Sequence, residues 1–212
     1  MKAILVGATG LVGSEVLKRL LEDPDYSEVV VYARRSPGIE HPRLRIVIGE
    51  LNEMNNHSAE LKGDIYFSCL GTTIKTAGSE ENFRKVDYHA VVNFGRLAAS
   101  LKAKKLLIVS ASGAHSQSSI FYSRVKGEAE KALKDMTLPG LVIFRPGLLI
   151  GDRTEKRTFE NVGVQGFRIL RHILPVKLTK SIGTEVSVLA DHMVTEGKNP
   201  TPGLKIIDPK EI

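Results

Sequence analysis

The feature that most constrains the fold of this chain is an alternation between short apolar runs and longer stretches of helical period. Strands buried in a parallel sheet are near-continuous apolar runs, whereas amphipathic helices repeat their apolar positions about every 3.6 residues. Repeated strand–helix–strand units favour a doubly wound parallel sheet with right-handed crossovers, so the sequence predicts an α/β fold. The expected strands are Ala3–Val6, Val29–Tyr32, Arg45–Ile48, Ile65–Leu70, Leu106–Val109 and Leu141–Phe144, and the expected helices include Leu11–Glu22, Glu81–Ser100 and Tyr122–Lys134.

The alternation loosens after the sixth expected strand. There we expect helices at Val164–His172 and near Val186–Glu196, followed by a last apolar run at Leu204–Ile207. No linker, internal repeat or low-complexity tract interrupts the chain, and its length suits one domain with a substantial core. The sequence therefore predicts a single domain over residues 1–212, in which residues 151–212 form a short cap on the substrate side.

Composition narrows the cellular setting. The single cysteine, Cys69, excludes an internal disulfide framework and fits a reducing compartment. Residues 1–6 are too short for the apolar core of a secretory signal peptide, and no apolar stretch is long enough for a spanning helix. We therefore expect a soluble, cytoplasmic protein without a membrane partner.

Charge and residue type also exclude some partners. The formal net charge is +6, but Lys and Arg are scattered, and only 6% of the residues are aromatic, so we expect no nucleic-acid binding. The histidines show no paired spacing with cysteine or carboxylates, so we expect no catalytic metal.

Three glycines, Gly7, Gly10 and Gly13 in the stretch GATGLVG, follow the first expected strand and open the first expected helix. Glycine permits a sharp turn and a close approach to a pyrophosphate, and the helix N-terminus offers free N–H groups to the anion. The spacing differs from the G-x-G-x-x-G of the common fingerprint, and a tight turn without a ligand would also use glycines. The position of the turn in the fold nevertheless favours an NAD(P) site of the Rossmann type.

The end of the second expected strand indicates which cofactor. A protein selective for NAD offers Asp or Glu to the ribose 2′-OH about 20 residues after the fingerprint. Here the sequence reads VYARRSPG, with Arg34 and Arg35 and no carboxylate. Guanidinium groups form forked hydrogen bonds with phosphate, so the pair predicts NADP(H) rather than NAD. Solvated surface arginines are the alternative.

Two further strand ends carry candidate cofactor contacts, because ligands of such sheets lie beyond the carboxyl ends of the strands. Leu70 and Gly71 are expected beside the adenosine or ribose, with Thr72 as a hydroxyl contact, although a turn of small residues explains Thr72 equally well. After the sixth strand, Leu148 is expected near the nicotinamide. Arg153 is expected to reach a phosphate or an acidic substrate, or to be a surface charge.

Candidate catalytic residues follow the fifth expected strand. Tyr122 and Lys126 are four residues apart, so they share one face of a helix. A neighbouring ammonium group favours the phenolate form of a tyrosine, which can then exchange a proton with a substrate oxygen. Ser110 and Ser112 are both candidates for polarising that oxygen. The Y-x-x-x-K pattern alone is common by chance, and its weight comes from its position after the turn and the serines.

Together, the stretches GATGLVG, YARR, CLGTTIKTAGSEENFRKVDY, SSIFYSRVKGEAE and FRPGLLIGDR resemble the short-chain dehydrogenase/reductase superfamily. The likeness is to its atypical branch, in particular to the Tat-interacting-protein group of NADPH-binding, oxidoreductase-like proteins and their bacterial relatives. The resemblance covers residues 3 to about 153 and is loose beyond them.

The resemblance implies that Thr9, Gly10, Leu11 and Val12 hold NADP(H), that Arg34 and Arg35 contact its 2′-phosphate, that Leu70 and Gly71 lie beside its ribose, and that Tyr122 and Lys126 form the active site. The chain departs from the superfamily at Asp87, where many members carry Asn, which puts a proton relay through that residue in doubt. The family also includes members whose main role is regulatory.

Three functions remain open at this point. The first is an NADP(H)-dependent oxidoreductase that acts on a small carbonyl or alcohol. In this reading Tyr122 is the acid/base, Lys126 is its activator and an anchor for the cofactor, and Ser112 or Ser110 is the oxyanion partner. The second is a regulatory protein that senses NADPH without turnover and has a protein partner. The third is a nucleotide-sugar epimerase or dehydratase, which usually has a larger C-terminal lobe. A homodimer is a reasonable expectation for any of them.

Overall fold

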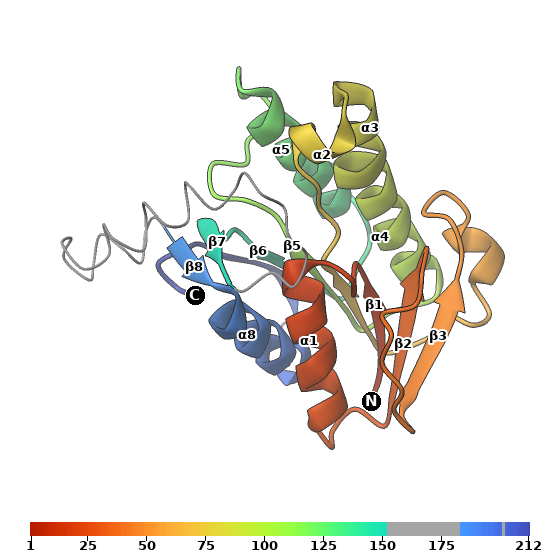
Figure 1. Ribbon diagram of the computed structural model, residues 1–212. Helices are drawn as coiled ribbons and strands as arrows, with labels where there is room; N and C mark the ends of the chain where they lie inside the picture. The colour runs from red at the N-terminus through yellow and green to blue at the C-terminus, as the bar shows by residue number, and fades with distance from the viewer. Residues whose placement is uncertain (152–182, 201) are drawn as a thin grey trace.

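A seven-stranded parallel sheet in the order β3-β2-β1-β4-β5-β6-β9 forms the centre of the molecule (Figure 1). The computed structural model describes residues 1–151, 183–200 and 202–212. The strand order reverses between β1 and β4, which makes the carboxyl ends of these two strands the place where such sheets bind ligands. The doubly wound α/β fold predicted from the sequence is therefore confirmed. The strands are β1 Lys2–Val6, β2 Glu28–Ala33, β3 Leu44–Ile48, β4 Ile65–Ser68, β5 Lys105–Val109, β6 Gly140–Phe144 and β9 Gly203–Ile207.

Helices cover both faces of this sheet and enclose two apolar cores (Figure 1). Successive residues of a strand point to opposite faces, so Leu5 of β1 packs in the core under α1 and α8, whereas its neighbour Ile4 packs in the core under α4 and α5. This two-sided burial is why the strands appear in the sequence as continuous apolar runs. The helices are α1 Leu11–Glu22, α2 Ile74–Ala77, α3 Glu80–Arg84, α4 Val91–Ser100, α5 Phe121–Lys134 and α8 Val186–Lys198, with a short 3-10 helix at Met54–His57.

The helix expected over Glu81–Ser100 is not one regular α-helix. It consists of α3, a π-helical segment over Lys85–Ala90 and α4. The wider π-helical turn carries Asp87, whose side chain is fully buried. π-Helical turns are rare and occur frequently at functional sites.

The C-terminal part of the chain contributes to the sheet and its helical layer. The expected helix near Val186–Glu196 is α8, which packs against α1, and the expected run Leu204–Ile207 is β9, which pairs with β6. These elements were expected to belong to a substrate-side cap, but they extend the main layers instead. A second small sheet joins β7 (Leu148–Ile150) to β8 (Gly183–Glu185).

Two expectations for this part, the helix at Val164–His172 and the contacts of Arg153, lie outside the residues that the structure describes. Within residues 1–151, 183–200 and 202–212, no helix combines the length and the apolar character needed to cross a membrane.

Candidate functional site

The glycine turn between β1 and α1 is shaped by close backbone contacts. Gly7 has a φ of +82°, and a Cβ there would lie 2.5 Å from the carbonyl oxygen of Cys69, at the end of β4. A Cβ on Gly13 would lie 2.0 Å from the carbonyl oxygen of Gly7. Packing therefore requires glycine at both positions, whether or not a ligand binds.

The N-terminus of α1 is open to an anion. Gly10 is the N-cap residue and provides no side-chain cap, and the first turn of the helix contains no acidic residue. By contrast, Thr73 and Ser79 cap α2 and α3 through their side-chain oxygens. Uncapped N–H groups and the positive end of a helix dipole suit a phosphate, so this turn fits the pyrophosphate of a dinucleotide. Of the residues expected to hold it, Thr9 and Gly10 are exposed, Leu11 is half-buried and Val12 is buried.

Arg34 and Arg35 lie at the same edge of the sheet as this turn. They follow β2 directly, and β2 pairs in parallel with β1, with Tyr32 opposite Val6. Both side chains are exposed. The two guanidinium groups are thus next to the strand end where a dinucleotide would place its adenosine ribose.

The expected contacts after β4 lie at this edge as well. Leu70 is buried and Gly71 is exposed, two and three residues beyond Ser68, which pairs with Val6. Thr72 donates its backbone N–H to Oδ2 of Asp87 at 2.9 Å. The loop after β4 is thereby tied to the π-helical turn.

Lys126 forms an ion pair that was not predicted from the sequence. Its Nζ lies 2.7 Å from Oδ1 of Asp87, and neither side chain reaches solvent to any extent, with exposed fractions of 6% and 0%. Burial alone would lower the pKa of Lys126, but the charge of Asp87, with smaller effects from Tyr122 and Glu130, raises it. The ammonium group of Lys126 is therefore paired with a carboxylate in the interior of the protein.

Tyr122 lies at the start of α5, one helical turn before Lys126. Its half-buried ring packs against Phe83 of α3, with 5.6 Å between the ring centroids. The ring of Phe83 is fully buried, so this contact fixes the start of α5 against α3. The structure thus brings together Tyr122, Lys126 and Asp87.

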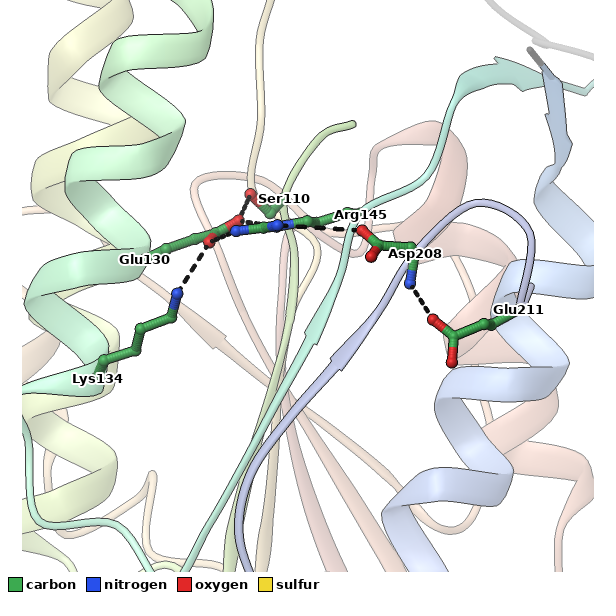
Figure 2. A network of polar contacts seen from close by, with 6 residues as sticks. All are labelled: Ser110, Glu130, Lys134, Arg145, Asp208 and Glu211. Atoms are coloured by element: carbon green, nitrogen blue, oxygen red, sulfur yellow. Dashed lines mark hydrogen bonds and ion pairs between the residues drawn. The ribbon is translucent and has the colours of Figure 1, made fainter. Parts of the chain in front are cut away.

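Ser110 belongs to a separate network of hydrogen bonds and ion pairs, which Figure 2 shows. Its hydroxyl donates to Oε1 of Glu130 at 2.6 Å, and both residues are buried. Glu130 also accepts two hydrogen bonds from Arg145, from Nε at 3.0 Å and from Nη2 at 2.6 Å. These contacts join α5 to the ends of β5 and β6, and Asp208, after β9, is 4.0 Å from Arg145.

Ser112 is exposed, and among the described residues its hydroxyl has no hydrogen-bond partner. Its backbone N–H donates to the carbonyl oxygen of Pro146 at 2.9 Å, which fixes the main chain at this point. Of the two candidate serines, Ser112 is thus the one with a hydroxyl available to a ligand. Leu148, the other expected contact in this region, is 48% exposed at the start of β7.

Two residues of the site were missed from the sequence. Glu130 and Arg145 lie in stretches that resemble the short-chain dehydrogenase/reductase superfamily, but neither was predicted to take part in the site. A signal for Glu130 was present, since a carboxylate four residues after Lys126 falls on the same buried face of the helix. Within the described part of the chain, no group of His, Cys, Asp or Glu has the arrangement of a metal site.

Comparison with known proteins identifies a family that binds a nicotinamide nucleotide. A family model described as NAD(P)H-binding matches residues 7–172. A curated relative, "Protein FMP52-1, mitochondrial" of Scheffersomyces stipitis, is 31% identical over 222 residues, which cover 100% of this chain and 97% of the relative. "Protein FMP52, mitochondrial" of Meyerozyma guilliermondii is 34% identical over 161 residues, covering 75% of this chain and 69% of the relative.

The names of these relatives contradict the cytoplasmic location expected from the sequence. That prediction was wrong because it rested on a single cysteine and on the lack of a secretory signal. Both observations argue against secretion, but neither separates the cytosol from an organelle.

A solved structure, "MoeE5 in complex with UDP-glucose and NAD", has a TM-score of 0.74 with 15% sequence identity, covering 98% of this chain and 75% of that one. At this identity the likeness concerns the fold alone. The family model spans most of the chain, and the first relative matches it from end to end. This chain therefore belongs to the NAD(P)H-binding family.

Proposed function

We propose that this chain is an NADP(H)-dependent oxidoreductase of the short-chain dehydrogenase/reductase type that acts on a small carbonyl or alcohol. The observation that carries the proposal is the placement of a buried Lys126 one turn from Tyr122, at the sheet edge that also holds the open N-terminus of α1. A phosphate turn alone would serve any nucleotide-binding protein, whereas a tyrosine beside a buried lysine provides a group for proton exchange.

The residues at this edge fit the cofactor. Gly7 and Gly13 keep the turn tight, and the uncapped N–H groups after Gly10 would receive the pyrophosphate. Arg34 and Arg35 would contact a 2′-phosphate, which favours NADP(H) over NAD. NADP(H), when bound, supplies or accepts the hydride.

The chain's own residues would handle the substrate oxygen. Tyr122 would exchange a proton with it, and the exposed hydroxyl of Ser112 would hold it by a hydrogen bond. The buried Ser110 would instead support α5 through Glu130. Lys126 would keep the tyrosine in a fixed electrostatic environment, and its ion pair with Asp87 prevents it from moving freely.

Nucleotide titration tests the cofactor. In calorimetry the parent protein should bind NADPH more tightly than NADH, and replacing both Arg34 and Arg35 by alanine should remove most of that difference. Each charged hydrogen bond lost is worth about 1.5–3 kcal/mol, which corresponds to at least about tenfold in Kd. Equal affinities for NADH and NADPH in the parent protein would contradict the NADP(H) assignment.

Turnover tests the chemistry. Tyr122→Phe should lower NADPH-dependent reduction of a responsive aldehyde, ketone or quinone at least about a hundredfold, the usual scale for losing a general acid. Because the phenol is expected to touch the substrate rather than the phosphates, NADPH affinity should stay within about twofold of the parent value. An active Tyr122→Phe variant would exclude this mechanism.

One observation favours a second function, an NADPH-sensing regulatory protein without turnover. Asp87 matches the charge of Lys126, so the lysine is less able to activate Tyr122 than a free ammonium group would be. Two results together would support the sensor. One is tight NADPH binding without NADPH consumption in the presence of aldehydes, ketones or quinones, and the other is a partner protein captured only when NADPH is present. This result would also suit membership of the Tat-interacting-protein group, which we propose as the finer placement.

Adding UDP-glucose to the candidate substrates tests the epimerase or dehydratase alternative. UDP-glucose is bound in the solved structure of similar fold, and its conversion without net NADPH consumption would identify an epimerase. Sedimentation of the same preparations measures whether the protein is a homodimer.

A further inference from the structure

The ion pair between Asp87 and Lys126 lies in the interior of the candidate site, where charged side chains are rare. Its two partners come from different helical segments. Asp87 is on the π-helical turn, and Lys126 is on α5. The second carboxylate oxygen of Asp87 accepts the backbone N–H of Thr72, so the carboxylate is held from two sides. A Cβ on Gly71 would lie 3.6 Å from both Oδ1 of Asp87 and Nζ of Lys126, which places the pair beside the loop that follows β4.

Several titratable groups of the described residues lie near this pair. On α5, Tyr122 and Glu130 flank Lys126 one turn away on either side. Glu130 is already engaged by Arg145. From α3, the neutral ring of Phe83 packs against Tyr122, and Arg84 forms an ion pair with Glu128 of α5 at 2.8 Å. From the end of β5, the neutral Ser110 lines the same small space as Asp87 and Lys126. Among the described residues, Asp87 is the carboxylate in direct contact with the ammonium group of Lys126.

We propose that Asp87 is a positioning residue that holds Lys126 in place and withholds its positive charge from the phenol of Tyr122. A nearby cation stabilises a phenolate, whereas a buried neutral pair has only a weak effect beyond its own contacts. An unpaired ammonium group favours the phenolate form of a neighbouring tyrosine, and a carboxylate paired with that ammonium group opposes the effect. The consequence for turnover rests on the proposed function, whereas the electrostatic coupling can be measured without nucleotide or substrate.

The direct test is a spectroscopic titration of Tyr122 in the nucleotide-free protein. Tyrosinate absorbs in the ultraviolet, and subtracting the titration of a matched variant that carries Tyr122→Phe isolates the signal of this one residue. Asp87→Asn keeps the shape of the side chain and removes its charge. In this variant Tyr122 should ionise at least about one pH unit lower than in the parent protein, the usual effect of an unopposed neighbouring cation.

A second comparison remains informative if Asp87→Asn fails to fold because it leaves a buried ammonium group unpaired. Replacing both partners, Asp87→Asn with Lys126→Met, removes the pair as a unit, a change that buried pairs often tolerate. If the parent pair is electrostatically neutral toward Tyr122, the phenol should titrate within about half a pH unit of its parent position in the double variant. If Lys126 acts as an uncancelled cation, the phenol should ionise at least about one pH unit higher in the double variant.

Two results would overturn the proposal. One is an unchanged or higher ionisation pH for Tyr122 in folded Asp87→Asn, and the other is a large upward shift in the double variant. A merely structural role for Asp87 would lower stability without moving the ionisation of Tyr122. Calorimetric titration with NADPH, carried out on the same proteins, reports on the proposed function separately, because a protein that binds no NADPH can still show or lack the coupling.

Discussion

The network around Glu130 provides the sharpest test of what holds α5, and with it Tyr122 and Lys126, in place (Figure 2). Glu130 is 2% exposed and accepts hydrogen bonds from Ser110 and, at two positions, from Arg145. Glu130→Gln preserves the shape, but it removes the charge and directs an NH₂ group toward one of these donors. The guanidinium group of Arg145 then has only one acceptor oxygen at this side chain.

The size of the effect follows from these contacts. Two charge-assisted hydrogen bonds are worth about 1.5–3 kcal/mol each, and breaking a buried pair by changing one partner costs about 3–5 kcal/mol. The side chain of Arg145 is 22% exposed, so water and Asp208 recover part of the loss. We therefore expect a decrease of about 3 kcal/mol in the free energy of unfolding.

Urea denaturation measures this decrease directly, and a chain of this length should also show a fall in Tm of about 6–12 °C. Lys134→Ala is the matched control, because Lys134 lies 3.4 Å from the same carboxylate but is 31% exposed. Its loss should cost less than about 1 kcal/mol, as for other partly solvated ion pairs. If Glu130→Gln is no more destabilising than Lys134→Ala, the network does not hold α5 in the way we describe.

Two further predictions concern stability. Gly13→Ala should cost about 3 kcal/mol in urea denaturation or prevent folding, because its Cβ would overlap the carbonyl oxygen of Gly7 at 2.0 Å. The hydrogen bond from Lys104, and then the one from the N–H of Lys2, hold the pKa of Asp64 below its ordinary 3.8. The stability from this lowered pKa is present above about pH 4 and is lost as the pH falls through the folded-state pKa, so Asp64→Asn should flatten the acid side of a plot of unfolding free energy against pH.

Local patterns were enough to predict most of the fold. The two-sided burial of β1 makes it a continuous apolar run, and the turn after it has glycine at Gly7 and Gly13 because the backbone leaves no room for a Cβ. The apolar run and the glycine turn each lie within a few consecutive residues, so each can be recognised without knowing the rest of the fold. The role of β9 as the seventh strand was not predicted, because an apolar run does not say which strand it will pair with.

The partners of the buried charges were harder to predict. Asp87 and Lys126 are far apart in sequence, and the π-helical turn that brings the carboxylate inward leaves no mark in the hydrophobic pattern. The choice between Ser110 and Ser112 depended on Glu130, which reaches the end of β5 only after α5 has packed on the sheet. Each of these features is set by contacts between elements rather than within one.

One general rule nevertheless connects the sequence to this part of the site. A charge on the buried face of a helix must find an opposite charge, because an unpaired buried charge costs several kcal/mol. Lys126 lies on the buried face of α5, and the π-helical segment that carries Asp87 packs against this helix and supplies the carboxylate. A carboxylate at position 87 therefore has a physical consequence. An Asn could accept a hydrogen bond from the lysine but would leave its charge acting on Tyr122, whereas Asp87 opposes that charge. We therefore expect the reactivity of the tyrosine to depend on a residue of the π-helical segment that packs against α5.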